Sequence, residues 1–180
     1  CVWGGMVDAK MATALTGRNG QALEDYKKRL LKLNNQVVAQ APEDLVINTH
    51  VCRGNYHSTF FSSGAYDSVA DLLFGEENVN AYYLEYDDKR SGGFAPLAKV
   101  SGDKKVVLGL ITTKIPQLED KGKVIARIHE AEKYIPLDRL YLSPQCGFAS
   151  CEIGNKLTEE EQWEKLKLVK EIAEEVWGDR

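Results

Sequence analysis

Four short apolar segments alternate with helical segments along this chain, and this alternation restricts its fold more than any other feature. The apolar segments are rich in β-branched and aromatic residues and are predicted to be buried strands: residues 44–52, 80–87, 104–114 and 138–146. Amphipathic helices are predicted over residues 19–40, 64–75, 120–135 and 157–178, with a weaker helix over 91–99. Strands that alternate with helices form right-handed crossovers and a parallel sheet. The sequence therefore predicts an α/β fold.

The composition fits one well-buried domain over residues 1–180. The chain has 180 residues, of which 43% are hydrophobic and 28% are charged, and this is enough for one core. The formal net charge of -4 comes from interspersed acidic and basic residues, without the basic stripe that neutralises nucleic-acid phosphates. No apolar run reaches the roughly 18 residues that span a bilayer, and the first residues lack a signal-peptide pattern. We therefore expect a soluble cytoplasmic protein that binds neither nucleic acid nor membrane.

The cysteines and the first residues give two further expectations. Cysteines stand at positions 1, 52, 146 and 151, too sparsely for a disulfide scaffold, so reduced thiols or metal ligation are expected. The chain starts without methionine, and Cys1 leads into a predicted Gly-Gly turn at residues 4 and 5. We therefore expect the chain to be part of a longer protein.

Polar side chains stand where the predicted strands end. His50 and Cys52 alternate at the end of the first strand, so both project from the same face. Glu85 ends the second strand, and Cys146 ends the fourth. In parallel sheets, ligands collect in the loops that follow the carboxyl ends of the strands. We therefore expect these four side chains to converge, provided that the sheet curves as it does in a barrel.

The donor atoms of these four residues are nitrogen, sulfur, oxygen and sulfur, a set that is typical of zinc. Taken alone, a His-x-Cys pair is more often a buried thiol beside a hydrogen-bonded histidine than a metal site. The sequence pattern by itself therefore leaves both interpretations open.

Three motifs together resemble the cobalamin-independent methionine synthase family, in particular the C-terminal zinc-binding barrel of its short members. They are THVCRGNYH at residues 49–57, YYLEYD at 82–87 and LYLSPQCGFAS at 140–150. The resemblance covers nearly all 180 residues in the same order. It implies a TIM-barrel-type (βα)n fold, of which this chain covers about the last four strand-helix units. The chain would then be the C-terminal half of a barrel, and the absent N-terminal half would carry the folate-contacting surface.

The resemblance also implies a function. In the family, residues corresponding to His50, Cys52, Glu85 and Cys146 bind a catalytic Zn²⁺, and the enzyme moves a methyl group from 5-methyltetrahydrofolate to the thiol of homocysteine, forming methionine. Zinc suits this reaction because coordination removes the thiol proton and leaves the nucleophilic thiolate. The alternatives are another methyl donor, such as a methylated corrinoid protein or a small methylated thiol, and a non-catalytic domain with a structural zinc.

The expected half barrel leads to a prediction about the partners of the chain. A sheet of four parallel strands leaves two unpaired edges and an open interior face. We therefore expect the chain to associate with its N-terminal half or with a second copy. Without the donor-binding half, the chain alone is expected to be inactive.

Several residues near the strand ends are weaker candidates. Arg53 and Asn55 follow Cys52 and either contact substrate or belong to an exposed loop. Asp87 shares the face of Glu85 and is expected to orient a ligand or the substrate. Lys114 either meets an anionic substrate group or caps the strand edge. Three residues are expected to lie outside the site: His57, His129 and Cys151.

Overall fold

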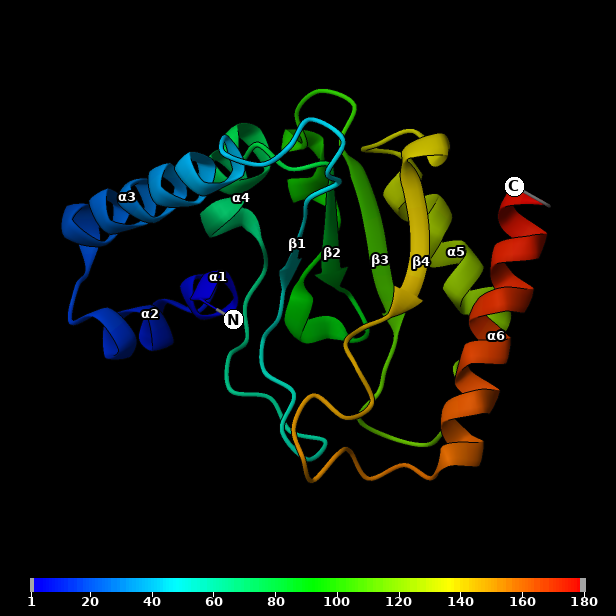
Figure 1. Ribbon diagram of the computed structural model, residues 1–180. Helices are drawn as coiled ribbons and strands as arrows, with labels where there is room; N and C mark the ends of the chain where they lie inside the picture. The colour runs from blue at the N-terminus through cyan, green and yellow to red at the C-terminus, as the bar shows by residue number, and fades with distance from the viewer. Residues whose placement is uncertain (1, 179–180) are drawn as a thin grey trace.

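The computed structural model describes residues 2–178 and contains a parallel sheet of four strands in the order β1-β2-β3-β4 (Figure 1). The strands are β1 (Asn48–Val51), β2 (Ala81–Glu85), β3 (Lys105–Ile111) and β4 (Leu140–Pro144). Each strand pairs in parallel with the next one along the chain. The predicted α/β fold is confirmed. Cys1 lies outside the described residues.

All four strands are shorter than predicted, and in β1 the reason is that pairing begins later than the apolar pattern does. Leu45 and Val46 precede β1 and are 55% and 68% exposed. Pairing of β1 begins at Asn48, whose partner is Ala81 in β2. Leu45 and Val46 therefore remain in the connecting loop.

Helices lie before β1 and after each strand, where the sequence predicts them. The long ones are α3 (Gly20–Val38), α4 (Asp67–Glu76), α5 (Lys121–Glu132) and α6 (Glu159–Trp177). The weak helix after β2 consists of two 3-10 segments, η1 (Lys89–Ser91) and η2 (Ala95–Lys99), and a third such segment, η3 (Leu137–Arg139), precedes β4. Two helices near the start of the chain were not predicted: α1 (Val2–Met6) and α2 (Ala9–Thr16).

The expected Gly-Gly turn is wrong, because Gly4 and Gly5 lie inside α1. A Cβ atom on Gly4 would lie 1.8 Å from the carbonyl oxygen of Cys52. The helix therefore contacts the backbone at the end of β1, an approach that only glycine permits. This contact places α1 directly against the segment that carries Cys52.

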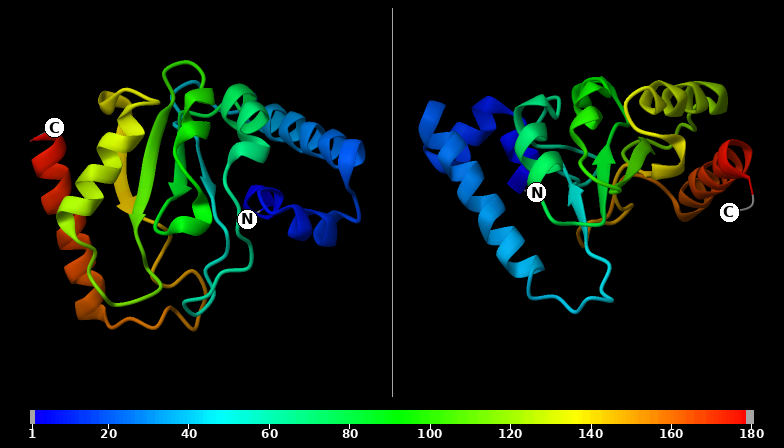
Figure 2. Two further views of the ribbon diagram at one scale, coloured as in Figure 1. Left: turned by 180° about the vertical axis from the view of Figure 1, so that it is seen from behind. Right: turned by 90° about the horizontal axis from the view of Figure 1, so that it is seen from above.

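The helices cover one face of the sheet and leave the other face open (Figure 2). Tyr82 and Leu84 of β2 point toward the helices and are 0% and 1% exposed, whereas Tyr83, between them, is 40% exposed on the other face. The open face is hollowed by about 570 Å³ and is lined by alternate strand residues, among them Asn48, Ala81, Tyr83, Lys105 and Tyr141. Within the described residues, β1 and β4 pair on one side only, so the sheet is not closed.

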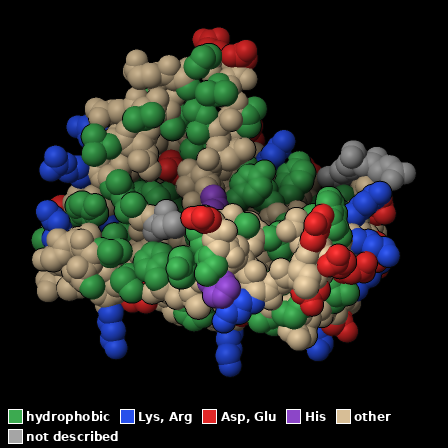
Figure 3. Space-filling model, turned by 60° about the horizontal axis from the view of Figure 1, so that its bottom comes forward, with side chains coloured by type: hydrophobic (Ala, Val, Ile, Leu, Met, Phe, Trp, Pro, Cys, Tyr) green, Lys and Arg blue, Asp and Glu red, His purple; other side chains and the backbone are tan. Residues whose placement is uncertain are grey.

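The carboxyl ends of the strands meet at one end of the molecule, the lower end in Figure 1. The loops after β1 and β4 approach each other there, although these strands are at opposite edges of the sheet. Figure 3 shows this end of the molecule, where lysine and arginine side chains project at the margins and do not gather into one patch. Within residues 2–178, no helix is long and apolar enough to cross a membrane.

Candidate metal centre

The structure brings the four predicted ligands together. One ligand atom from each of His50, Cys52, Glu85 and Cys146 lies within 4.8 Å of all the others. His50 belongs to β1, Glu85 is the last residue of β2, and the two cysteines lie just beyond β1 and β4. His50 and Glu85 alternate with the buried residues of their strands, so they project on the side of the sheet that the helices leave open.

His50 is oriented by the neighbouring strand. Its Nδ1 lies 3.0 Å from the carbonyl oxygen of Tyr83. A carbonyl can only accept, so Nδ1 carries a proton and Nε2 is the nitrogen that could ligate a metal. Desolvation lowers the pKa of His50, but its hydrogen bond to Cys146 and the Tyr83 carbonyl raise it by more, so the net shift is upward.

The two cysteine thiols lie within hydrogen-bonding distance of each other. Their Sγ atoms are 3.8 Å apart, and Cys52 also accepts a hydrogen bond of 3.3 Å from the backbone N–H of Gly54. The hydrogen bond from Cys52 lowers the pKa of Cys146. The same bond, together with burial and the charge of Glu85, raises the pKa of Cys52. Cys146 therefore loses its proton more readily than Cys52, and a bound cation would displace the proton from Cys52.

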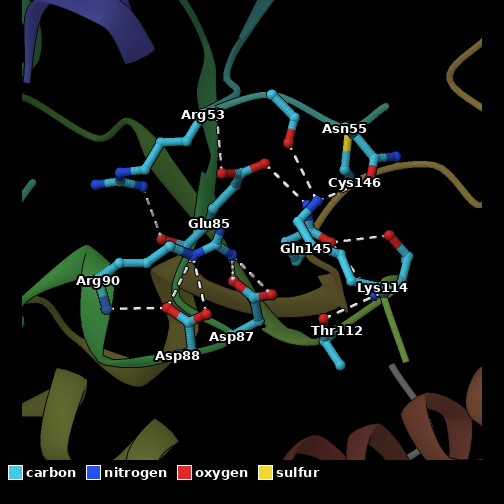
Figure 4. Close-up of polar contacts among 12 residues, drawn as sticks. Arg53, Asn55, Glu85, Asp87, Asp88, Arg90, Thr112, Lys114, Gln145 and Cys146 are labelled. Carbon is cyan, nitrogen blue, oxygen red and sulfur yellow. Dashed lines mark hydrogen bonds and ion pairs between the residues drawn. The ribbon is translucent and has the colours of Figure 1, made fainter. Parts of the chain in front are cut away.

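Glu85 is fixed on both sides. Its side chain is 0% exposed, and its two oxygens accept hydrogen bonds from Gln145 Nε2 at 3.0 Å and from the backbone N–H of Arg53 at 2.9 Å (Figure 4). Burial raises the pKa of Glu85, and these two hydrogen bonds partly offset that rise. Gln145 was not singled out from the sequence, although it directly precedes Cys146.

A glycine on β3 allows Gln145 to reach this position. A Cβ atom on Gly109 would lie 2.8 Å from the Cα of Gln145 and 2.8 Å from the carbonyl oxygen of Leu84. The pairing of β3 with β4 also shifts register between Gly109 and Ile111. The chain after β4 therefore crosses close over β3 and carries Gln145 to Glu85.

The donor set fits zinc. Thiolate and imidazole donors favour zinc over magnesium or calcium, which prefer oxygen ligands. His50 and Cys146 line a hollow of about 310 Å³, whereas Cys52 and Glu85 are buried behind it. The site is therefore accessible from one side only.

Arg53 is neither in an exposed loop nor open to a substrate. Its side chain is 0% exposed and points away from Cys146 in Figure 4. The guanidinium donates to the carbonyl oxygen of Gly64 at 2.6 and 3.0 Å, and to the hydroxyl of Tyr66 at 2.8 Å. It also donates to the carbonyl oxygen of Glu85 at 3.2 Å. These contacts fasten the segment after β1 to the end of β2.

Asp87 lies near Glu85 but is engaged with Arg90. Arg90 Nη2 is 2.9 and 3.1 Å from the two carboxylate oxygens of Asp87, and the Asp87 side chain is 1% exposed. Arg90 also pairs with Asp88 at 2.9 Å. Arg90, which the sequence did not indicate, therefore offsets one of the two negative charges of Asp87 and Asp88.

The remaining candidates lie outside the cluster of four. His57 contacts the carbonyl oxygen of Gly154 at 3.1 Å, and the exposed His129 contacts Glu132 at 2.9 Å. Cys151 is a half-buried free thiol. Asn55 and Lys114 are buried and hydrogen-bonded to each other at 2.8 Å, so neither lies in an exposed loop.

Comparison with known proteins shows the family of the chain. Residues 22–175 match the family model described as "Cobalamin-independent synthase, Catalytic domain". This chain therefore belongs to the cobalamin-independent methionine synthase catalytic-domain family. The protein YxjG of Bacillus subtilis is 49% identical over 159 residues, which are 88% of this chain and 42% of YxjG. A methionine synthase of Pyrococcus abyssi is 27% identical over 101 residues, 56% of this chain and 26% of that protein.

Solved structures show the same fold. A Listeria monocytogenes protein named as a vitamin-B12 independent methionine synthase has 34% identity and a TM-score of 0.71, over 98% of this chain and 46% of that one. A B12-independent methionine synthase from Shewanella has 21% identity and a TM-score of 0.62, over 93% of this chain and 53% of that one, and shows the fold alone. The fold is of the TIM-barrel type, and the described sheet is an open part of it. The chain spans about half the length of these two structures.

Proposed function

We propose that this chain carries the zinc centre of a methyltransferase that moves a methyl group from 5-methyltetrahydrofolate to the thiol of homocysteine. The observation that supports this proposal most strongly is the convergence of His50, Cys52, Glu85 and Cys146 within 4.8 Å, in a chain of the methionine synthase family. Zn²⁺ held there would lower the pKa of an acceptor thiol, so that the sulfur is a thiolate at neutral pH.

The chain's own residues hold the site in shape. Tyr83 fixes the tautomer of His50 and leaves Nε2 as the donor. Gln145 and the backbone of Arg53 hold the Glu85 carboxylate. Two cysteines and one carboxylate supply three anionic donors, and this electron-rich environment limits how much charge is withdrawn from an acceptor sulfur.

The hollow beside His50 and Cys146 is the proposed route for the acceptor, because it is the accessible side of the site. The acceptor sulfur forms a bond to the methyl carbon while the bond from that carbon to the donor nitrogen breaks. The electron pair stays on the nitrogen, which then takes a proton. The donor must be held within attack distance of the sulfur for this step, and we assign that task to the N-terminal half of the barrel.

Two alternatives are weaker. A methylated corrinoid protein or a small methylated thiol is the alternative donor, because the four residues activate the acceptor and do not select the donor. A purely structural zinc is less consistent with the site, since structural sites are closed and usually use closely spaced Cys and His, whereas His50 and Cys146 line an open hollow.

Free thiols at the centre fit a reducing compartment such as the cytoplasm.

Serine substitutions test the proposal in the chain joined to the N-terminal half that we propose it needs. Cys52→Ser and Cys146→Ser should each abolish zinc retention and methionine formation together, because a hydroxyl is a poor zinc donor. Cys151→Ser is the matched control and should retain both. Full zinc retention and methyl transfer by Cys146→Ser would refute the site.

A further inference from the structure

The two cysteines of the centre come from opposite edges of the sheet. β1 and β4 are separated by β2 and β3, and neighbouring strands are about 4.8 Å apart, so the edge strands are up to about 14 Å apart. The Sγ atoms of Cys52 and Cys146 are nevertheless 3.8 Å apart. The loops after β1 and β4 must therefore be drawn together across the ends of the two central strands.

Asn55 joins these two loops. It stands three positions after Cys52 and donates through Nδ2 to the carbonyl oxygen of Gly147 at 2.7 Å and to Ser150 Oγ at 2.6 Å. Ser150 Oγ in turn lies 3.5 Å from Cys146 Sγ. The side-chain amide of Asn55 therefore connects the segment of one cysteine to the segment of the other.

The same amide is held from its other side. Asn55 Oδ1 accepts from Lys114 Nζ at 2.8 Å and from Asn155 Nδ2 at 3.0 Å. An asparagine amide has two donor hydrogens and two acceptor lone pairs, so all four are used. Asn55 is only 9% exposed, and it has no hydrogen-bonding capacity left for a substrate.

Lys114 and Asn155 bring a third loop into this arrangement. Lys114 follows β3, is 8% exposed, and also donates to the carbonyl oxygen of Gly54 at 3.1 Å. Asn155 lies in the loop after β4, donates to the carbonyl oxygen of Thr113 at 2.8 Å, and accepts from the backbone N–H of Ser58 at 2.9 Å. The loops after β1, β3 and β4 thus meet at one point.

The backbone of the loop after β1 supports this interpretation. His57 and Ser58 have φ angles of 43° and 65°, in the left-handed region that is unfavourable for a residue with a Cβ. Contacts from the loop after β4 hold both residues: the carbonyl oxygen of Gly154 for His57, and the backbone N–H of Lys156 for Ser58 Oγ at 2.8 Å. The loop after β1 therefore takes its shape from its attachment to the loop after β4.

We propose that Asn55, Lys114 and Asn155 form a loop clamp that holds Cys52 against Cys146, with Asn55 as the central positioning residue. The functional role of the clamp depends on the proposed metal centre. Its effect on the distance between the two thiols does not require a metal. The role differs from the substrate contact expected for Asn55 from the sequence.

Metal affinity is the first test, with Asn35→Ala as the control for Asn55→Ala. Asn35 also bridges segments through its amide, donating to the Glu76 carbonyl and accepting from the Asn78 N–H, each at 2.8 Å, but on α3 and outside the clamp. With Zn²⁺ measured by competition against a chromophoric chelator, Asn55→Ala should bind at least about 10-fold more weakly than the parent. Asn35→Ala should bind zinc as tightly as the parent does. Equal zinc affinity in Asn55→Ala and Asn35→Ala would overturn the proposal.

A metal-free measurement separates the clamp from the metal centre. In a background with Cys1→Ser and Cys151→Ser, mild oxidation of the metal-free chain should join Cys52 to Cys146 as a disulfide. The oxidant is a small soluble disulfide, whose sulfur–sulfur bond accepts the two electrons and is cleaved to two thiols, which take up the two protons. Asn55→Ala should slow this reaction at least about 10-fold, because the thiols lose their enforced proximity.

The two measurements have separate outcomes. If the parent chain binds no zinc, the metal proposal fails, and the rate of disulfide formation still decides the fate of the clamp. If Asn55→Ala does not fold, as judged by circular dichroism, the half-buried Asn155→Ala takes its place with the same expected slowing. A parent-like rate in the folded clamp variant would overturn the proposal.

Discussion

Burial raises the pKa of individual carboxyl groups in this protein, and Glu77 shows the effect away from the proposed metal centre. Glu77 is 1% exposed and accepts a hydrogen bond from Asn34 Nδ2 at 3.1 Å. Burial is the largest cause of its shift and raises the pKa of the carboxyl above its usual value of 4.5. A raised folded-state pKa means that the folded chain holds this proton more tightly than the unfolded chain does.

The sign of this linkage gives a pH prediction. The stability contributed by a group with a raised folded-state pKa is fully present below the unfolded pKa and is lost as the pH rises through the folded pKa. The permanently neutral Glu77→Gln should therefore be more stable than the parent at pH 7, by up to about 1 kcal/mol, and the difference should shrink toward pH 4. Urea denaturation at the two pH values measures this.

The neighbouring Glu76→Gln is the control, since it removes the same charge from an exposed side chain. The free energy of unfolding of Glu76→Gln, taken relative to the parent, should change much less between pH 7 and pH 4 than that of Glu77→Gln. An advantage of Glu77→Gln that grows on acidification would contradict the assignment.

At the residue scale, the sequence predicted which four side chains converge but not the residues that orient them. His50, Cys52, Glu85 and Cys146 could be predicted because they end strands, and strand ends in a parallel sheet share one edge. The side chain of Arg53 turns inward because Gly64 and Tyr66, in the following loop, offer an oxygen each. Loop partners of this kind follow no periodicity, so the pattern of the sequence does not predict them.

At the scale of elements, the long helices and the strands could be predicted, whereas α1 could not. It has five residues, two of them glycines, and glycine lowers helix propensity. Tertiary packing stabilises α1 in place of helix propensity. Trp3 and Met6 pack in the core and are 6% and 2% exposed. The helix depends on the close contact of Gly4 with Cys52.

This contact predicts opposite outcomes for two Gly→Ala substitutions. Gly4→Ala should destabilise the fold by more than about 2 kcal/mol and weaken zinc binding, because its Cβ would overlap the Cys52 carbonyl oxygen, 1.8 Å away. Gly75→Ala, in α4 with nothing within 4 Å of the added atom, should be neutral or stabilising by about 0.5–1 kcal/mol. Thermal and urea denaturation check both, and a neutral Gly4→Ala would contradict the packing of α1 on this segment.

At the scale of the whole molecule, the open sheet bears on whether the chain associates in solution. β1 and β4 each have an unpaired edge within the described residues, and Tyr83 and Tyr141 are 40% and 39% exposed on the uncovered face. Exposed edges and apolar faces of this kind favour association. The alternation of strands and helices predicted this parallel sheet.

We therefore predict that the isolated chain associates, either with a second copy or with the N-terminal half of the barrel when that half is supplied. Alone, it should form methionine at a negligible rate, because no donor is held near the acceptor sulfur. Sedimentation velocity across a range of concentrations measures the first claim, and a well-folded monomer at all of them would contradict it. Methionine formation by the isolated chain at the rate of the combined halves would contradict the second.

The most direct test of the proposed metal centre is zinc X-ray absorption of the reduced, zinc-loaded chain, with and without homocysteine. We predict two sulfur donors at about 2.3 Å and lighter donors at about 2.0–2.2 Å, supplied by Cys52, Cys146, His50 and Glu85. Adding homocysteine should bring a third sulfur into the zinc shell, as a catalytic site that activates a thiol requires. A sulfur count that stays at two in saturating homocysteine would contradict the account, as would a zinc shell without both cysteines.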